Sequence, residues 1–288
     1  MRDFEFLEPS SIEEASRMLA EAGENSRVMA GGTALMLAMR QRMLAPSTVV
    51  SVARIAALQG ISFDPAQGLR IGALSRHVDV AEADVIKQQY PMLAEMAAKL
   101  ANPQVRHQGT LGGNICYADP STDPSTCLIA LNAQIVLGSV RGQRMMPLER
   151  FLVDYFQTAI EQDELVVEVR VPVLPSGFRG QYRRFRKTAA EHRPLVNIAV
   201  AAQLEQDRCQ QARIVVGAST PVPQRLKETE ALLKNQVIDQ ALLKKASIAA
   251  SQEVNAVSDN RASESFRREM VRVNAYRCLA DTFGLPQE

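Results

Sequence analysis

The sequence predicts an α+β fold in two domains, of which the first is larger and consists of two lobes. Its 288 residues suffice for two typical domains, since most domains contain roughly 100 to 200 residues. The expected strands fall in hairpins and not in repeated β-α-β units. A segment rich in proline and glycine, residues 172–180, separates two regular stretches. We predict a first domain over residues 1–175, with lobes of about 1–60 and 61–175, and a second over 176–288.

The first lobe is expected to alternate helices with short strands. Ser10 and Glu13 form a capping box before apolar residues at helical spacing. The pair Gly31-Gly32 is predicted to be a turn between a strand and a helix. The expected elements are a helix that ends at Gly23, a strand over 27–30, an apolar helix from Thr33 to about Met43 and a strand over 48–52.

The second lobe is expected to open with a hairpin, because residues 61–63 and 69–73 flank the turn residues Asp64-Pro65 and Gly68. Residues 75–100 show a helical pattern with a break at Pro91. The polar stretch over 102–124 contains a second pair, Gly112-Gly113, and no regular element is predicted for it. Strands follow near 133–137 and over 165–171.

The C-terminal domain is expected to pair an antiparallel sheet with helices. In three stretches apolar and polar residues alternate as they do in strands, and in the remainder of the chain apolar residues recur at helical spacing. The expected strands span 180–186, 196–204 and 212–216, and the helices begin near Val222, Asp239 and Ser263.

Charge and hydropathy exclude several classes of partner. Lys and Arg number 33 against 32 Asp and Glu, so no overall field attracts nucleic acid or an anionic membrane. The longest uncharged apolar stretch, residues 28–39, is too short to span a bilayer. Two of the first five residues, Asp3 and Glu5, are acidic, where a signal peptide needs a basic end. We therefore expect a cytoplasmic protein without membrane insertion and without a nucleic-acid partner.

The reactive side chains form no catalytic or metal-binding pattern. The four cysteines make no CxxC pair and have no spacing that suits zinc or an iron–sulfur cluster. No Ser-His-Asp, Cys-His or paired-carboxylate set is evident. We expect no metal site and no catalytic side chain.

The two glycine pairs are candidates for phosphate binding. Glycine lets successive backbone N–H groups approach an anion, and a helix that begins beside the pair adds its dipole. A single such pair is more often steric than functional. The fingerprint of dinucleotide-binding folds, G-x-G-x-x-G after a strand, is absent. Two pairs about eighty residues apart suggest one pyrophosphate held between two lobes.

The residues around both pairs resemble the flavoprotein subunit of the xanthine dehydrogenase and carbon monoxide dehydrogenase family. The resemblance extends to Glu164-Leu165-Val166 and, near the end of the chain, to Arg261-Ala262-Ser263 with Phe266-Arg267-Arg268. It covers essentially the whole sequence. The central motifs are Ala30-Gly31-Gly32-Thr33-Ala34-Leu35, Asn102-Pro103-Gln104-Val105-Arg106, Thr110-Leu111-Gly112-Gly113-Asn114 and Ala118-Asp119-Pro120-Ser121-Thr122-Asp123.

The resemblance implies a two-lobed FAD-binding domain of the PCMH/vanillyl-alcohol-oxidase type, followed by a smaller α+β domain. It places the pyrophosphate and ribityl region against the first pair, with the second pair opposite. It places Asp123 near the flavin's sugar and phosphate, and the Val166 backbone at the isoalloxazine. The implied cofactor-binding residues are Met29, Ala30, Gly31, Gly32, Thr33, Ala34, Leu35, His107, Thr110, Gly112, Gly113, Asn114, Asp123 and Val166.

The sequence departs from the family pattern in the basic run over residues 183–187. Family members often carry a lysine before the following strand, and Arg184 occupies that position when residues are counted back from Val196. A small gap would put Lys187 there instead. Either cation is a candidate to face the flavin and to favour its reduced, anionic form.

The resemblance implies an electron-transfer subunit of a molybdenum-dependent hydroxylase. A large subunit would carry molybdopterin, a small one 2Fe-2S clusters, and FAD on this medium subunit would pass electrons to NAD+, oxygen or another acceptor. The redox chemistry would belong to the cofactor. Two alternatives stay open, a stand-alone FAD-dependent reductase or oxidase and a scaffold subunit without flavin.

Overall fold

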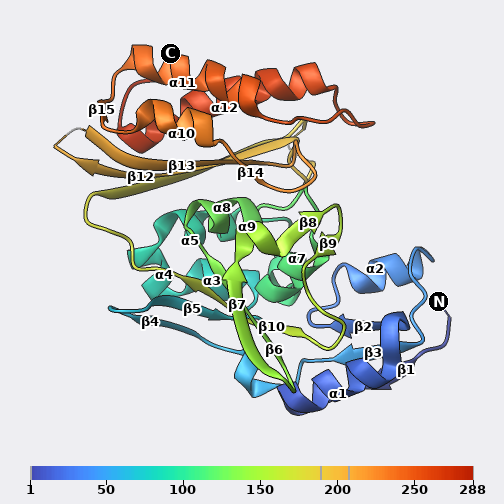
Figure 1. The fold of residues 1–288 in the computed structure, drawn as a ribbon. Coiled ribbons are helices and arrows are strands. Elements are labelled where there is room, and N and C mark those ends of the chain that lie inside the picture. The colour runs from blue at the N-terminus through green and yellow to red at the C-terminus, as the bar shows by residue number, and fades with distance from the viewer. Residues whose placement is uncertain (1, 189, 207, 288) are drawn as a thin grey trace.

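The computed structural model describes residues 2–188, 190–206 and 208–287. Three layers stack along the molecule (Figure 1). We call them the first lobe (residues 5–58), the second lobe (61–171) and the C-terminal layer (178–287). The α+β fold class is confirmed, whereas the domain limits near residues 60 and 175 stay predictions.

The first lobe is a small parallel sheet with a helix on each face (Figure 1). Its strands are β1 (Glu5–Leu7), β3 (Thr48–Ser51) and β2 (Ser26–Met29), in that order; its helices are α1 (Ile12–Ala22) and α2 (Leu35–Arg40), with single turns η1 (Gly23–Asn25) and η2 (Ala56–Leu58). Ala15 and Leu19 of α1 pack on Val50, and the same cluster includes Val167 of the second lobe.

Two predictions for this lobe were wrong in detail. The N-cap of α1 is Ser11, whose hydroxyl accepts from Glu14 N at 3.1 Å, and not Ser10. Two S-x-x-E pairs overlap here, and the backbone of Ser10 donates to the Glu14 carboxylate instead. Helix α2 starts at Leu35, two residues later than expected, so the first glycine pair is followed by two further residues without helical structure.

The second lobe is an antiparallel sheet covered by helices. The strands β4 (Ile61–Asp64), β5 (Gly68–Gly72), β10 (Leu165–Val171), β6 (Gln134–Ser139) and β7 (Gly142–Pro147) lie in that order, and β8 (Leu152–Asp154) pairs with β9 (Gln157–Thr158). The helices are α3 (His77–Glu82), α4 (Asp84–Gln89), α5 (Pro91–Ala98), α6 (Pro103–Gln108), α7 (Leu111–Tyr117), α8 (Pro124–Ala130) and α9 (Leu148–Phe151).

Strand β10 is buried on both faces, which explains its nearly continuous apolar sequence. Val169 and Val171 pack with the helices of the second lobe, and Leu165 and Val167 pack against the first lobe. One face of this sheet therefore packs against the helices of the second lobe and the other against the first lobe, and β10 contributes to both cores.

The stretch over residues 102–124, for which the sequence predicted no element, contains two short helices. The side chain of Asn102 caps α6 through Val105 N at 2.9 Å, and Pro103 occupies the first helical turn, where its missing N–H costs nothing. Thr110 caps α7 in the same way through Gly113 N at 3.2 Å. The second glycine pair thus lies inside the first turn of a helix.

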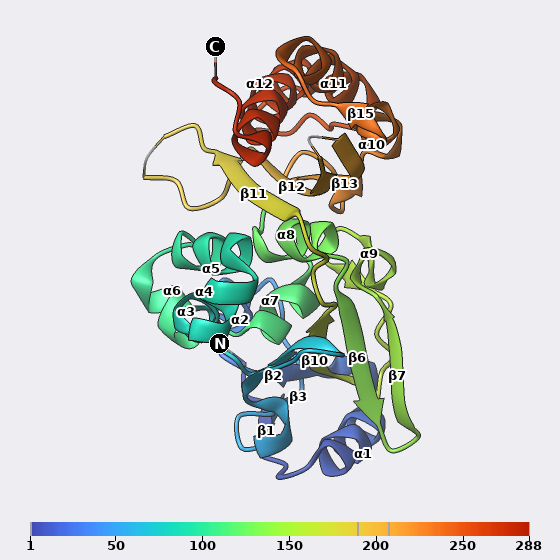
Figure 2. The same cartoon turned by 90° about the vertical axis from the view of Figure 1, so that its left-hand side faces the viewer.

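The C-terminal layer confirms the expected antiparallel sheet with helices. The sheet contains β11 (Phe178–Phe185), β12 (Val196–Glu205), β13 (Arg208–Gly217) and β14 (Gln224–Arg225) in that order, with β15 (Gln236–Val237) beside β13; the helices are α10 (Lys227–Leu233), α11 (Gln240–Glu253) and α12 (Glu264–Phe283). The helices cover the outer face, and the other face rests on α8 and α5 (Figures 1 and 2).

Strand β12 alternates between two cores. Ile198 and Val200 face the helices of the C-terminal layer, whereas Ala199 and Ala201 belong to the core of the second lobe. None of the helices in the described ranges combines the length and the apolar character that a bilayer crossing needs.

Candidate functional site

The structure brings the two glycine pairs together where the lobes meet. A Cβ atom on Gly31 would lie 2.0 Å from the carbonyl oxygen of Gln108, two residues before Thr110. A Cβ on Gly113 would lie 3.7 Å from that of Ala30. Two segments about eighty residues apart are therefore in van der Waals contact, and Gly31 is required because no side chain fits there.

The first pair presents a run of free backbone donors. Within the part of the chain that the structure describes, no protein acceptor bonds to the N–H groups of residues 31–35. Gly32 has φ of +70°, a left-handed conformation that glycine adopts without strain. These residues are only partly buried, and successive N–H groups in such a turn form a concave site for an anion.

The second pair is built differently, because its amides donate to groups of the protein. The N–H groups of Leu111 and Gly112 donate to the carbonyls of Ser75 and Ala73, both at 2.9 Å, and Gly113 N donates to the Thr110 hydroxyl. A Cβ on Gly112 would lie 2.6 Å from that of Ala73. Gly112 therefore serves close packing.

Two features of α7 remain available to a ligand. Gly113 is exposed beside the first pair, so its surface is open although its N–H group is bonded. Asn114 follows it, and its Oδ1 atom is buried without a hydrogen-bond partner among the described residues. A buried side-chain oxygen without a partner is uncommon in a folded protein, and this one suits a ligand that donates a hydrogen bond.

Asp123 is buried where the second lobe meets the C-terminal layer. The Tyr182 hydroxyl donates to its Oδ1 atom, and Arg184 Nη1 donates to Oδ2 at 3.1 Å. Burial raises the pKa of the Asp123 carboxyl, and the bonds from Tyr182 and Arg184 oppose that rise. Burial and the neighbouring carboxylate raise the pKa of Tyr182 well above its usual value.

The two cations of the basic run have different surroundings. The side chain of Arg184 is 14% exposed and is committed to Asp123. Lys187 is exposed in the loop between β11 and β12, which projects from the body of the molecule (Figure 2). Its backbone N–H donates to the Glu191 carboxylate at 3.2 Å.

The other predicted residues lie close to the paired segments or in the core. His107 is exposed on α6, one residue before the Gln108 carbonyl that meets Gly31. Val166 is buried on β10, paired with Leu137 immediately before a bulge. Met29, Ala30, Thr33, Ala34 and Leu35 are partly exposed.

Sequence reasoning missed the partners of Asp123. Asn197 Nδ2 donates to the Thr122 carbonyl at 2.9 Å and lies 3.4 Å from Asp123 Oδ1. A fully buried asparagine within the apolar strand β12 was a usable signal, because buried amides need specific partners. Tyr182 offered no such signal, because its contact joins positions far apart in the chain.

The chain matches two family models. Residues 2–174 match the FAD binding domain in molybdopterin dehydrogenase, and residues 181–282 match the CO dehydrogenase flavoprotein C-terminal domain.

Similar proteins match along almost the entire chain. The 6-hydroxypseudooxynicotine dehydrogenase complex subunit alpha of Paenarthrobacter nicotinovorans is 33% identical over 96% of this chain and 93% of its own. The glyceraldehyde dehydrogenase medium chain of Sulfolobus acidocaldarius is 31% identical over 94% and 95%. A solved carbon monoxide dehydrogenase from Hydrogenophaga pseudoflava superposes with a TM-score of 0.94 at 28% identity, covering 98% of each chain.

These matches agree with the two-lobed fold. The chain therefore belongs to the family of FAD-binding domains in molybdopterin dehydrogenases, and it is an FAD-binding medium subunit of the molybdenum hydroxylase type, an oxidoreductase.

Proposed function

We propose that residues 31–35 bind the pyrophosphate of FAD and that the chain relays electrons within a molybdenum hydroxylase complex. The observation that carries this placement is the run of five free N–H groups at the left-handed turn of Gly32. Oriented backbone donors stabilise an anion without bringing a competing charge. The Thr33 hydroxyl adds a further donor, and the short helix α2 begins just beyond.

The residues at the junction of the lobes fit the remainder of this cofactor. Gly113 is exposed close to Ala30, and Asn114 offers a buried side-chain oxygen to a donor group of the ligand. Met29, Leu35, His107 and Thr110 border the same junction. Asp123 lies beyond the C-terminal end of α7, where the resemblance puts the sugar, and Val166 is assigned to the isoalloxazine.

The bound FAD supplies the redox chemistry, because flavins exchange electrons one or two at a time. The side chains of this subunit bind and orient the cofactor, and none is assigned as a general acid or nucleophile. Of the two cations, we assign Lys187 to the flavin, since Arg184 is held by Asp123. Electrons would arrive from 2Fe-2S clusters on a small subunit and leave to NAD+, oxygen or another acceptor.

Partners follow from the names of the relatives. They are described as a medium chain or as one subunit of a dehydrogenase complex. We propose a hetero-oligomer in which a large subunit carries molybdopterin and selects the substrate. A stand-alone reductase or oxidase would turn over its substrate without these subunits. A scaffold without flavin would remain colourless after incubation with FAD.

Replacement of Gly32 by Val tests the placement. A branched side chain at Gly32 would obstruct the approach of the anion, so we expect flavin absorbance of the purified full chain to fall at least tenfold. Gly23→Val is the matched control, because Gly23 has φ of +67° with open space around it and lies outside the site. Circular dichroism checks that both variants are folded.

A second variant, Thr33→Val, removes the hydroxyl without altering the glycine conformation and should weaken FAD retention to a smaller degree. Full flavin content in both Gly32→Val and Thr33→Val would show that the pyrophosphate lies elsewhere. Substrate turnover by the full chain without partner subunits would favour the stand-alone alternative.

A further inference from the structure

The segment between α7 and α8 is held in place by the C-terminal layer. Residues 119–123 bond to this layer through two carboxylates and two backbone carbonyls. The pairs are Asp119 with Arg193, the Pro120 carbonyl with Ala218 N at 3.0 Å, the Thr122 carbonyl with Asn197 Nδ2 at 2.9 Å, and Asp123 with Tyr182 and Arg184. The conformation of the segment therefore depends on where the C-terminal layer puts these donors.

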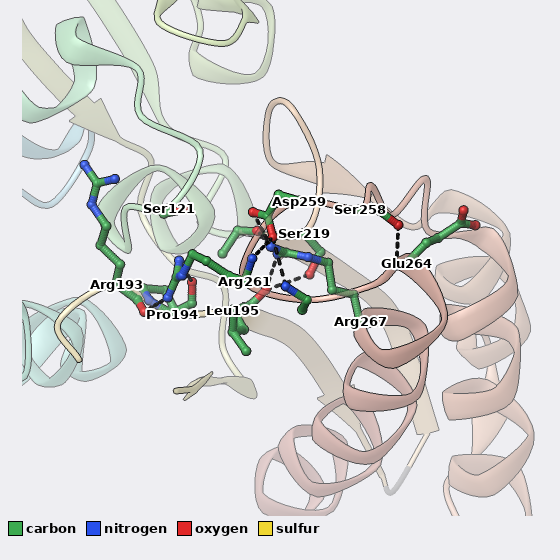
Figure 3. A network of polar contacts seen from close by, with 12 residues as sticks. Ser121, Arg193, Pro194, Leu195, Ser219, Ser258, Asp259, Arg261, Glu264 and Arg267 are labelled. Carbon is green, nitrogen blue, oxygen red and sulfur yellow. Dashed lines mark hydrogen bonds and ion pairs between the residues drawn. The ribbon is translucent and has the colours of Figure 1, made fainter. Parts of the chain in front are cut away.

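One of these donors, the backbone of Ala218, is itself held by a buried arginine at the start of α12. Arg267 is 1% exposed, and its Nη1 atom donates to the carbonyls of Leu195 at 2.8 Å and Ala218 at 2.5 Å (Figure 3). Its Nη2 atom bonds to Asp259 at 2.6 Å. Ala218, at a positive φ of 60°, thus accepts from Arg267 and donates to Pro120.

Arg261 holds a second of these donors, Arg193. It donates to the carbonyl of Arg193 at 2.7 Å and to that of Pro194 at 3.2 Å (Figure 3). The side chain of Arg193 extends from this point to the buried carboxylate of Asp119, which also accepts from Ser121 N at 2.9 Å. Two arginines of the C-terminal segment thus each hold a residue that bonds to the start of residues 119–123, Arg193 to Asp119 and Ala218 to Pro120.

Burial of a guanidinium group adds little net stability to a core, because its charge loses its hydration. Removing the charge from water costs several kcal/mol, and Arg267 has a single carboxylate partner that is itself partly exposed. Its Nε atom has no partner among the described residues. Its Nη1 atom does, however, donate to two carbonyls that flank neighbouring strands, Leu195 just before β12 and Ala218 just after β13, which an apolar side chain cannot do.

We propose that Arg267 is a positioning residue for the flavin site. It fixes Leu195, two residues before Asn197, and Ala218, whose N–H donates to Pro120, and through these it sets the conformation of residues 119–123. The inference rests on the proposed position of FAD beside Asp123. The C-terminal layer thereby shapes a binding segment that belongs to the second lobe.

The variant Arg267→Lys tests this role, because lysine keeps the charge but has one nitrogen in place of Nη1 and Nη2, which together bond two carbonyls and the Asp259 carboxylate. We expect amide hydrogen exchange over residues 118–124 of the full chain to accelerate about tenfold, since each lost bond to a charged donor weakens the hold by a comparable factor. The dissociation constant of FAD should rise by about the same factor, and the visible circular dichroism of bound flavin should change.

Arg268→Lys is the matched control. Arg268 is the next residue of α12 and also donates to two backbone carbonyls, those of Ser251 and Gln252, at 2.9 and 3.0 Å. These contacts join α12 to α11 and do not reach the flavin segment, so all three readouts should stay at wild-type values. Asp259→Asn leaves Arg267 in place without its carboxylate and should shift the readouts in the same direction by a smaller factor.

The outcomes separate this inference from the proposed function. Unchanged exchange over residues 118–124 in Arg267→Lys would overturn the positioning role. If Gly32→Val lost its flavin in the same experiments, the proposed pyrophosphate site at residues 31–35 would still stand. Faster exchange with unchanged FAD affinity and an unchanged flavin spectrum would also overturn it, and would move the flavin away from Asp123.

Discussion

At the scale of single residues, the glycines of the site perform different tasks. Gly31 and Gly112 admit neighbouring atoms that any side chain would displace, the Gln108 carbonyl and the Ala73 methyl group. Gly32 supplies a left-handed backbone with only ordinary contacts around it. Substitutions at these positions therefore act through packing in two cases and through backbone conformation and ligand access in the third.

His77 gives a residue-scale prediction about pH. It is buried beside Gly109, and burial lowers its pKa from 6.5 to about 4. The unfolded chain takes up a proton as the pH falls below 6.5, whereas the folded protein does so only near pH 4. Folding stability should thus be unaffected above pH 6.5 and decline towards pH 4, by roughly 3 kcal/mol from this group.

Urea unfolding of the wild type and His77→Gln, measured between pH 7 and pH 4, checks this expectation. Glutamine does not titrate, so the free energy of unfolding of the variant should fall less steeply over this range. Parallel curves for the two proteins would show that His77 does not titrate as its burial requires.

At the scale of elements, the first turn of α7 depends on the Thr110 hydroxyl, which accepts from Gly113 N. Thr110→Val keeps the shape and removes the acceptor, so the protein should lose about 1 kcal/mol of unfolding free energy. Thr110→Ser retains the hydroxyl and should lose much less. Chemical unfolding measures both, and equal losses would mean that the methyl group and not the cap is responsible.

Elements with a long alternating or helical pattern were predictable from the sequence. Strand β12 and helix α12 were expected close to where they lie, because each presents apolar residues at a constant period. Helices α6 and α7 were missed, since each is a short helix whose start depends on one capping side chain. Strand β7 was missed because its residues are almost all exposed and carry no alternation.

The candidate site was predictable only in part. The glycine pairs are local signals, and their nearness in space was expected from their chemistry. The satisfied amides of α7 were not foreseeable, because their acceptors, Ala73 and Ser75, lie almost forty residues earlier in the chain. The same applies to Tyr182 and Arg193, whose contacts depend on how the C-terminal layer docks on the second lobe.

At the scale of the whole molecule, the joint between the second lobe and the C-terminal layer contains a buried carboxylate. Tyr182→Phe removes the hydroxyl that donates to Asp123 and should cost about 2 kcal/mol of unfolding free energy, the usual range for a bond to a charged group. Because that bond opposes the effect of burial, the pKa of Asp123 should rise further in the variant.

Tyr276→Phe is the control for that measurement. The Tyr276 hydroxyl is buried and has no partner among the described residues, so its removal should leave the stability unchanged or slightly higher. Thermal or chemical unfolding of both variants provides the comparison. A similar loss in the two would indicate that the cost reflects cavity formation and not the bond to Asp123.

The contacts that hold residues 119–123 also determine which amino-acid substitutions this segment tolerates. At Pro120 and Thr122 the C-terminal layer holds backbone carbonyls, which every amino acid possesses. Side chains at these positions can therefore be substituted without loss of these hydrogen bonds. Asp119 and Asp123, in contrast, contribute carboxylate oxygens that few other residues supply. The side chains that the segment presents can thus vary while its backbone conformation is kept.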